Sequence, residues 1–294
     1  TSNDGRLARH RWEIIGHGYK PIAKGGSEAW VIPPIKEVVN WDQKGKAIKR
    51  SSPTIRIRNE DLYEQVGLTW TYAKETGRRF GYLPEGSLFS HTGYVFIPND
   101  SENVWKFMSI LNSDLYHCLF LSETIERTWE AGEVGSVPWR EDLEELESLG
   151  NLAQEQYQTV LQQRIGDPAS PYYVGPSLLP GEEDPEFFHD HPHAEQIDEE
   201  IEVKIEPLSP DLSIPEAAQG CKRRELRYRQ QLEDLSEQIN TQIYDELGIT
   251  EVTQEDIRQE IFLRTAEDPE DREVPDPESV PDVPDNLDEQ VRDL

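Results

Sequence analysis

The stretch Gly67-Leu68-Thr69-Trp70-Thr71, followed closely by Arg79-Phe80-Gly81-Tyr82-Leu83-Pro84-Glu85-Gly86, stands in the part of the chain that is not strongly acidic. It combines aromatic, hydroxyl and guanidinium side chains with glycine turns. Aromatic rings stack on bases, while arginine and hydroxyl groups hydrogen-bond to base edges and phosphates. This composition predicts a surface that reads nucleic acid, within an α+β domain of mixed strands and helices.

The charge of the chain changes near residue 140. The 294 residues carry 29 Lys and Arg against 59 Asp and Glu, a formal net charge of −30. Residues 1–140 hold 18 basic and 17 acidic residues, whereas residues 141–294 hold 11 and 42. A near-neutral amino-terminal block is therefore joined to a very acidic remainder.

The acidity favours adaptation to high salt, where counterions screen the self-repulsion of the chain. Arg outnumbers Lys by 19 to 10, and the acidity continues through segments with a helical pattern. The alternative is an acidic interaction tail on an ordinary protein. Phosphate contacts weaken steeply with salt, so a DNA reader at high salt depends more on base-edge contacts, stacking and shape. A small basic excess is then compatible with DNA binding.

Residues 1–140 are predicted to form one compact domain. Short apolar runs bounded by Gly and Pro predict strands at 29–32, 37–41, 54–57 and 93–97. Asn99-Asp100-Ser101 offers helix N-caps, and a helix is predicted over 104–121. Extended structure is predicted over 133–138.

The carboxyl-terminal half alternates helices with acidic segments. An amphipathic helix is predicted over 141–165 and a helical segment over 221–265, with Gly248 as a C-cap between helices 222–247 and 251–263. Residues 166–220 are predicted to be an acidic loop rich in Pro and Gly, with a short strand at 200–205. Residues 266–294 carry 12 acidic residues, 2 basic residues and 5 prolines, which predicts a disordered tail.

The two long amphipathic helices need partners, because neither can bury its apolar stripe alone. The favoured interpretation is an antiparallel helical hairpin within one chain. A coiled coil between chains is the alternative.

A series of segments carries a family resemblance. In chain order they are Tyr19-Lys20-Pro21-Ile22-Ala23-Lys24-Gly25-Gly26, Val38-Val39-Asn40-Trp41, Ile57-Arg58-Asn59, Gly67–Thr71, Arg79-Phe80-Gly81, Pro84-Glu85-Gly86-Ser87-Leu88-Phe89, Ile110-Leu111-Asn112-Ser113, Gly132-Glu133-Val134-Gly135-Ser136-Val137-Pro138 and Ile243-Tyr244-Asp245-Glu246-Leu247-Gly248-Ile249. This series resembles the carboxyl-terminal half of the PglX family, the adenine-specific DNA methyltransferases of BREX phage-defence systems. Related segments occur in type IIG restriction-modification enzymes. The resemblance covers about residues 19–140, and residues 222–263 more weakly.

The resemblance implies that residues 1–140 are a DNA target-recognition-like domain, which reads a double-stranded DNA sequence and presents it to a methylase. Those enzymes carry an Asn-Pro-Pro-Tyr/Phe motif and a glycine-rich S-adenosylmethionine loop, which this sequence lacks. Ile32-Pro33-Pro34-Ile35 has neither the Asn that would hold the adenine amino group nor the aromatic ring that would stack on the flipped base. The chain is therefore expected to bind no cofactor and to act with a methylase supplied in cis or in trans. The parent reaction would move a methyl group from S-adenosylmethionine to adenine N6.

Two groups of candidate residues are suited to phosphate contact. Lys24-Gly25-Gly26 lets backbone N–H groups approach an anion, with an ordinary turn as the alternative. Six basic residues and no acidic residue lie between Gln43 and Asn59, and phosphate contacts need such groups. These six are Lys44, Lys46, Lys49, Arg50, Arg56 and Arg58. The alternative for them is a solvated loop and strand face.

A third group is suited to base reading. Thr69, Trp70 and Thr71 offer hydroxyl groups and a stacking ring, and Arg78 and Arg79 offer forked donors that can bind guanine. The arginines are the better candidates for specificity, because Trp70 is more typical of a structural core residue.

Other clusters are weaker. His189, His191 and His193 alternate, but their acidic, proline-containing context favours an incidental run, so no metal site is predicted. Lys222-Arg223-Arg224 with Arg227 and Arg229 either contacts phosphate or pairs with neighbouring acids; both interpretations stay open. No Ser-His-acid order, P-loop or pair of catalytic carboxylates stands out.

A second hypothesis is a non-enzymatic interaction protein, in which helices 141–165 and 222–247 dock on a partner and the acidic tail mimics or repels DNA. No run of 18 apolar residues predicts a membrane span, and the first twelve residues lack the apolar core of a signal peptide. The expected location is the cytoplasm. The chain starts at Thr1 and its single methionine is Met108, so it is expected to be a fragment of a longer protein. The missing methylase motifs indicate the carboxyl-terminal piece of a split gene, a truncated fragment or a subunit that acts with a separate methylase.

Overall fold

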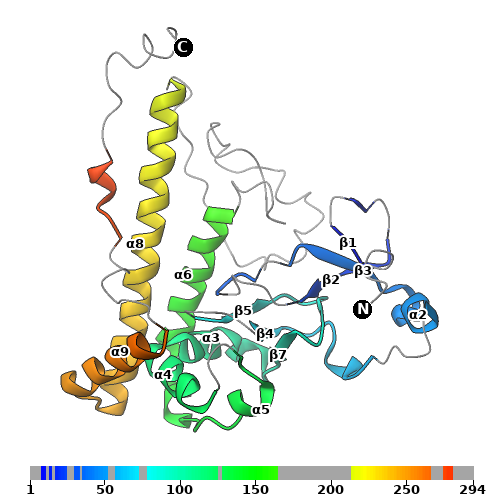
Figure 1. The fold of residues 1–294 in the computed structure, drawn as a ribbon, viewed down its shortest axis with the longest axis horizontal. Helices are drawn as coiled ribbons and strands as arrows, with labels where there is room; N and C mark the ends of the chain where they lie inside the picture. The colour runs from blue at the N-terminus through cyan, green and yellow to red at the C-terminus, as the bar shows by residue number, and fades with distance from the viewer. Residues whose placement is uncertain are drawn as a thin grey trace. The chain divides into compact units, whose positions relative to one another are not determined.

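The computed structural model describes residues 8–10, 13–14, 17–24, 30–33, 35–51, 57–72, 78–124, 128–164, 213–265 and 274–280. The chain divides into two compact units, which we call unit 1 (Thr1–Tyr157 and Ser236–Pro269) and unit 2 (Gln158–Leu235 and Glu270–Leu294). Strands and short helices come first along the chain and long helices follow (Figure 1). The predicted α+β class is confirmed.

One sheet of unit 1 has four strands in the order β1-β3-β2-β6. Its strands are β1 (Ala8–His10), β2 (Tyr19–Ala23), β3 (Glu37–Asn40) and β6 (Leu88–Phe89). The β1–β3 and β2–β3 pairs are antiparallel, and β2–β6 is parallel. The strand predicted at 37–41 is thus confirmed as β3.

The other sheet is antiparallel in the order β5-β4-β7, from β4 (Gly67–Thr71), β5 (Phe80–Leu83) and β7 (Gly93–Phe96). Every residue of β4 and β5 is buried. The helix α3 (Val104–Asn112) packs against both strands, so this sheet lies inside unit 1. The strand predicted at 93–97 is confirmed as β7.

The outer edge of β5 is paired by groups from outside the sheet. Asn112 accepts a hydrogen bond from the Phe80 amide (3.1 Å) and donates one to the Phe80 carbonyl (2.9 Å). Val31 donates to the same carbonyl (3.1 Å) and accepts from the Tyr82 amide (2.8 Å). The strand predicted at 29–32 is therefore reduced, in its described residues, to the single bridge of Val31 with Gly81.

The helix predicted over 104–121 is two helices, α3 and α4 (Asp114–Glu123), preceded by a 3-10 turn (Ser101–Asn103) that Asp100 caps. Ser113 breaks the run because it is extended and its hydroxyl accepts from the Tyr116 amide as the N-cap of α4. The strand predicted at 54–57 lies mostly outside the described residues, and Ile57 is in no strand.

The extended structure predicted over 133–138 is wrong at its start. Residues Ala131–Val134 form the short helix α5. Glu130 and Glu133 make a capping box, in which the Glu133 carboxylate accepts from the Glu130 amide at 3.0 Å. These reciprocal bonds satisfy the first amides of the turn and stabilise the helix.

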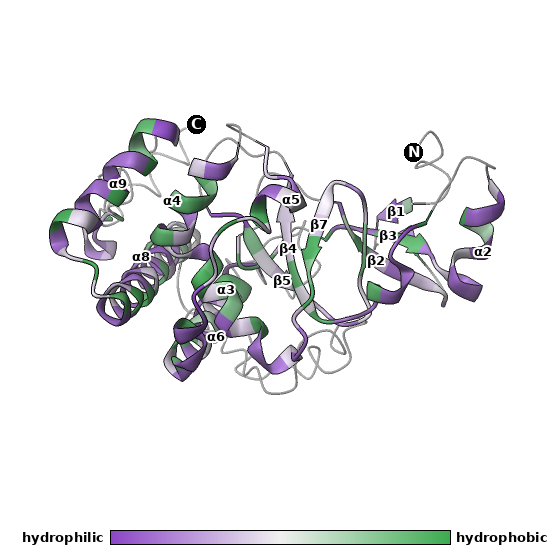
Figure 2. Cartoon of the chain, turned by 90° about the horizontal axis from the view of Figure 1, so that it is seen from below, coloured by the Kyte–Doolittle hydropathy of each residue, from purple (hydrophilic) through white to green (hydrophobic). Residues whose placement is uncertain are grey.

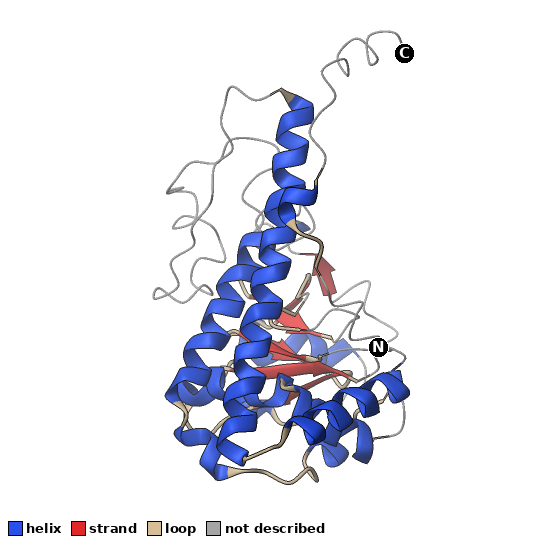
Figure 3. Cartoon of the chain, turned by 90° about the vertical axis from the view of Figure 1, so that its left-hand side faces the viewer, coloured by secondary structure: helices blue, strands red, loops and turns tan. Residues whose placement is uncertain are grey.

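The long helices are α6 (Glu147–Arg164), preceded by a 3-10 turn (Glu141–Glu145), and α8 (Ile214–Leu247). Within unit 1 they run antiparallel, because Ser148 donates to Gln242 (2.5 Å) and Gln156 donates to Ser236 (2.9 Å). Figure 3 shows the two helices side by side. The predicted intramolecular helix pair is confirmed over these residues.

The end predicted for the loop 166–220 is wrong by several residues, because α8 already begins at Ile214. Ser213 and Glu216 form an N-terminal cap, with the Ser213 amide donating to Glu216 at 2.8 Å. The strand predicted at 200–205 lies outside the described residues.

Gly248 ends α8 as predicted. Its φ is +62°, the Gly248 amide donates to the Asp245 carbonyl (3.2 Å) and the Ile249 amide donates to the Tyr244 carbonyl (2.8 Å). These two bonds make a Schellman motif. The helix α9 (Glu251–Thr265) follows and packs on α4, and its Ile257 and Ile261 are buried. The predicted tail 266–294 is described only at 274–280, which contains the 3-10 turn η7 (Pro277–Ser279).

Changing Gly248 to alanine is expected to lower the free energy of unfolding by about 1–2 kcal/mol, the cost of a left-handed conformation with a Cβ atom. An added Cβ would meet nothing within 4 Å, so the cost comes from the backbone alone. Denaturant unfolding measures it. Gly132→Ala is the matched control, since that site is equally open and its φ is not in the left-handed region; an equal effect at both sites would contradict the prediction.

None of the described helices combines the length and the apolar composition that a membrane span requires.

Candidate nucleic-acid interface

Four of the predicted phosphate-binding residues lie exposed on one short element, α2 (Asp42–Ser51). They are Lys44, Lys46, Lys49 and Arg50. Figure 2 shows α2 mostly in hydrophilic colours. Arg58, also exposed, follows on the way to the 3-10 turn η2 (Glu60–Leu62). We call these five side chains the α2 basic surface.

The start of α2 is a left-handed turn. Gln43, Lys44 and Gly45 all have positive φ, at 49°, 54° and 69°. Gly45 lies against the Trp41 ring so closely that an added Cβ would be 2.5 Å from it. Trp41 in turn makes an edge contact with Tyr63, with ring centroids 5.3 Å apart. A glycine at 45 is therefore needed to bring the lysines of α2 beside Trp41.

Local partners hold some of these cations. Lys46 donates to the Gln43 side-chain oxygen at 2.9 Å. Lys49 pairs with Glu60 at 2.7 Å and lies over the Trp41 ring at 5.9 Å from its centroid. Exposed pairs of this kind are worth about 0–1 kcal/mol, so a phosphate can replace them at small cost. The arrangement is suited to several separate contacts with the phosphates of a DNA backbone, more than to one site that binds a single phosphate tightly.

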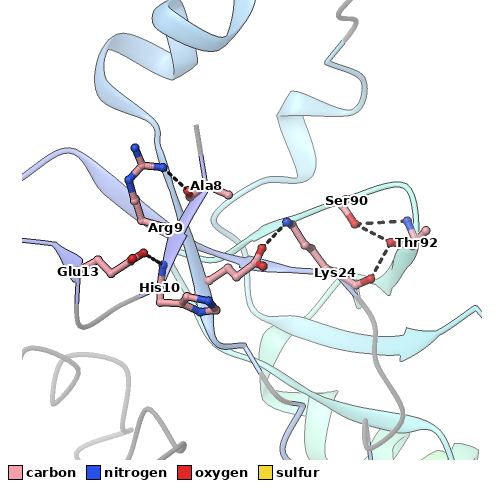
Figure 4. A network of polar contacts seen from close by, with 8 residues as sticks. Ala8, Arg9, His10, Glu13, Lys24, Ser90 and Thr92 are labelled. Atoms are coloured by element: carbon pink, nitrogen blue, oxygen red, sulfur yellow. Dashed lines mark hydrogen bonds and ion pairs between the residues drawn. The ribbon is translucent and has the colours of Figure 1, made fainter. Parts of the chain in front are cut away.

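Lys24 lies elsewhere, in a polar network beside β2. Its ammonium pairs with Glu37 of β3, and its carbonyl accepts a hydrogen bond of 2.6 Å from the Thr92 hydroxyl, which also contacts Ser90 (Figure 4). The side chain is about one-third exposed. Its neighbours Gly25 and Gly26, like Arg56, lie outside the described residues.

Thr69, Trp70 and Thr71 are interior residues of β4, with 2%, 3% and 5% of their surface exposed. The Thr69 hydroxyl donates to the Tyr94 carbonyl (2.8 Å) and the Trp70 indole to the Trp129 carbonyl (3.0 Å). Direct base contact by these side chains, predicted from their composition, is therefore corrected to a role in the core. The preference for Trp70 as a structural residue is confirmed.

Arg79 is also in the core, with 1% of its surface exposed. Its guanidinium lies over the Trp129 ring, 4.1 Å from the centroid. Burial lowers the pKa of Arg79 to about 10, which still leaves the group charged at neutral pH. A residue so enclosed cannot bind guanine in this conformation, so the predicted base reading by Arg79 is corrected to a cation–π contact within unit 1.

Arg78 has a different partner set. It donates to the Ser236 hydroxyl (3.0 Å), lies 3.6 Å from an Asp114 carboxylate oxygen and stacks over the Trp30 ring at 5.3 Å. Its side chain is 11% exposed. Arg78 thus joins the end of the 78–79 segment to α4 and α8, and its predicted role in base reading is corrected to a structural one.

The residues around Arg78 were not predicted from the sequence. Gln156 of α6 donates to the same Ser236 oxygen, and Asn240 of α8 accepts from the Asp114 amide at 2.9 Å. One feature of the sequence could have indicated this polar cluster. Ser236 is a polar residue within the apolar stripe of α8, between Leu235 and Ile239.

Residues 32–35 do not fit a methyl-transfer site. Ile32 and Ile35 are 3% and 5% exposed, and Ile35 packs in a core cluster with Ala23 and Leu83. The buried side chains of Ile32 and Ile35 carry no hydrogen-bonding group that could hold an adenine amino group or S-adenosylmethionine. His189, His191 and His193 lie outside the described residues, among which no three His, Cys, Asp or Glu side chains are grouped to hold a metal.

No family model matches the chain. The chain is similar to the adenine-specific methyltransferase BrxX of Escherichia coli O9:H4 (strain HS), with 30% identity over 134 residues. The aligned part is 43% of this chain and 11% of that relative. The chain spans about a tenth of the length of this relative. Over the aligned residues, the similarity supports a relationship to a methyltransferase, which is the broader part of the predicted resemblance.

Proposed function

We propose that this chain is the DNA-recognition portion of an adenine-specific methyltransferase of a phage-defence or restriction-modification system. The observation that carries the proposal is the similarity to the methyltransferase BrxX. The narrower assignment to recognition is supported by the sequence, which has no Asn-Pro-Pro-aromatic motif, and by the buried apolar setting of Ile32 and Ile35.

In this proposal the α2 basic surface positions the duplex. Lysine and arginine contacts to phosphate fix the register of a protein on DNA and carry no sequence information themselves. The four exposed cations of α2, with Arg58, offer such contacts without an acidic residue between Gln43 and Asn59. Lys24 lies outside the α2 basic surface, and its proposed contact with phosphate has less support because its ammonium is already paired with Glu37.

Catalysis in this proposal belongs to a methylase domain supplied in cis or in trans. That partner would bind S-adenosylmethionine, the methyl donor, and the flipped adenine. This chain would supply duplex binding and target choice. Thr69–Thr71, Arg78 and Arg79 lie in the interior. The residues that read bases would therefore come from positions of unit 1 that are exposed.

Neutralising Lys44 and Lys46 together (Lys44→Gln/Lys46→Gln) is expected to weaken binding of the full chain to all duplex sequences alike. Each lost phosphate contact lowers the slope of log affinity against log salt by about 0.9, so the double variant should lose about 1.8. Fluorescence anisotropy with random-sequence duplex DNA, over a series of KCl concentrations, measures both effects.

Arg140→Gln/Arg258→Gln is the matched control. It removes two exposed cations that lie outside α2 and are paired with neighbouring carboxylates, Asp142 and Glu255. An equal loss in both double variants would show a general charge effect and overturn the assignment to α2. Absence of DNA binding by the wild-type chain at every salt, with and without an added methylase domain, would favour the acidic interaction protein instead.

A further inference from the structure

The first turn of α2 has the opposite hand to the turns that follow it. The φ and ψ angles of Gln43, Lys44 and Gly45 are 49° and 46°, 54° and 48°, and 69° and 30°, all in the left-handed helical region. Glycine enters this region readily, whereas the Cβ atom of a glutamine or a lysine is crowded there. Residues in this region normally occur singly. The local backbone therefore gives no reason for a glutamine at position 43.

Hydrogen bonds from three backbone amides fix this left-handed turn. The Trp41 amide donates to the Gly18 carbonyl (2.7 Å), and the Asp42 amide donates to the Asn40 side-chain oxygen (3.1 Å). The Gly45 amide donates to the Trp41 carbonyl (3.1 Å). A strained backbone persists only where the surrounding structure fixes it, and such positions gather at functional sites. The turn therefore presents its two exposed side chains from a fixed backbone.

Gln43 is a neutral hydrogen-bonding group within the α2 basic surface. Its side chain is exposed, and its amide oxygen accepts a hydrogen bond of 2.9 Å from the Lys46 ammonium. An amide oxygen has two lone pairs, so this one can accept a second hydrogen bond, and the amide nitrogen carries two hydrogens that can donate. A side chain that is already held in place loses less freedom when it binds. Lys44 and Lys46, on either side of it, are suited to phosphate.

A glutamine amide matches one base edge in the major groove of DNA. Its oxygen accepts from the N6 amino group of adenine while its nitrogen donates to N7, which gives two bonds to one base. Guanine presents two acceptors at the same edge, so the amide oxygen would face another oxygen there. Phosphate contacts fix the position of a protein on DNA, and contacts of this second kind distinguish the bases. The chemistry of the Gln43 amide therefore selects adenine.

We propose that Gln43 is a specificity-determining residue, which reads one adenine of the target in the major groove while the α2 basic surface holds the neighbouring phosphates. This inference rests on the proposed function and adds to it a base and the residue that reads it. Gln43 is an exposed position of unit 1, and it takes the role that the buried Thr69–Thr71, Arg78 and Arg79 cannot have.

The test selects bound duplexes from a random-sequence library with the full chain at one KCl concentration. The wild-type chain should enrich an adenine at a position where Gln43→Ala enriches no base. Affinity of Gln43→Ala for the selected duplex should fall by about 5- to 150-fold, the discrimination of one bidentate base contact. Gln43→Glu should prefer cytosine at that position, because a carboxylate accepts from the cytosine amino group. Gln259→Ala, at an exposed glutamine of α9, is the control and should keep the wild-type preference.

A modified base tests the contact itself. Replacing the enriched adenine by 7-deazaadenine removes the N7 acceptor and leaves the base pair intact. The wild-type chain should bind this duplex more weakly than the selected one, whereas Gln43→Ala should bind both equally. Because the two changes remove the same hydrogen bond, their effects should not add.

The outcomes separate this inference from the proposed function. If Gln43→Ala keeps the adenine preference, or loses affinity equally for every duplex, Gln43 does not read a base and the inference is overturned. A uniform loss in Lys44→Gln/Lys46→Gln would then still support the proposed function; Lys46→Gln keeps an N–H that can donate to the Gln43 oxygen. A wild-type chain that enriches no adenine also overturns the inference. Binding to no duplex, with and without an added methylase domain, overturns both.

Discussion

Changing Arg78 to methionine is expected to lower the free energy of unfolding of unit 1 by about 3–5 kcal/mol, the usual cost of removing one partner of a buried ion pair. The guanidinium contacts Ser236, Asp114 and the Trp30 ring, and its side chain is 11% exposed. Methionine keeps most of the hydrocarbon but leaves the Asp114 carboxylate without this cation. The loss should appear in denaturant unfolding followed by tryptophan fluorescence, because all seven tryptophans lie in unit 1.

Two further variants make this result specific. Arg78→Lys keeps the charge but not the forked donor, so an intermediate loss is expected. Arg50→Met removes an exposed cation of α2 and should change stability by no more than about 0.5 kcal/mol. A stable Arg78→Met protein with an altered preference among DNA sequences would instead restore Arg78 as a base-reading residue.

Asn112→Asp is expected to destabilise unit 1 by about 3 kcal/mol or more at pH 7. The Asn112 amide donates to the Phe80 carbonyl and accepts from the Phe80 amide, and the residue is 6% exposed. A carboxylate keeps the acceptor, loses the donor and places a buried charge beside a carbonyl oxygen. Leaving buried polar groups unsatisfied costs about 1–3 kcal/mol, and more when a charge is involved.

The Asn112→Asp deficit should depend on pH. Burial raises the pKa of an introduced aspartate above its usual value of about 3.9, and the protonated acid regains a donor. A group with a raised folded-state pKa contributes stability that is lost as pH rises through that pKa. The deficit relative to wild type should therefore shrink between pH 8 and pH 5, above the isoelectric point of 4.5. Asn112→Leu is the control, and its deficit in stability should not vary with pH. A deficit of Asn112→Asp that is equally independent of pH would contradict the prediction that the protonated acid donates a hydrogen bond to the Phe80 carbonyl.

Helix positions were the part of the fold that the sequence predicted well. The stripes of α6, α8 and α9 and the C-cap at Gly248 follow from spacing and local backbone chemistry, which act within a few residues. The errors at helix boundaries had local signals too. Ser113, the Glu130–Glu133 pair and the Ser213–Glu216 pair all cap helices, and each marks a helix start that was not predicted.

The residues of β4, and Arg79 directly before β5, show what the sequence alone does not decide. Aromatic, threonine and arginine side chains suit a DNA-reading surface and a buried polar core equally well. Thr69 and Arg79 find their partners 25 and 50 positions away, at Tyr94 and Trp129. Such pairings depend on tertiary packing. The exposure of the α2 lysines was easier to predict. Six cations in a stretch without an acid are unfavourable unless they face solvent or an anion.

The pairing of the β5 edge by Asn112 and Val31 bears on how these molecules behave when crowded together. An open strand edge is a template for another chain, and proteins usually deter such joining by placing charge nearby. A formal charge of −30 deters it by repulsion in dilute buffer, but salt at high concentration screens that repulsion to within a few ångströms. At β5 the edge is closed by intramolecular hydrogen bonds: the Phe80 amide and carbonyl and the Tyr82 amide are already paired with Asn112 and Val31 of the same chain. This edge therefore stays closed to sheet-to-sheet association at any ionic strength.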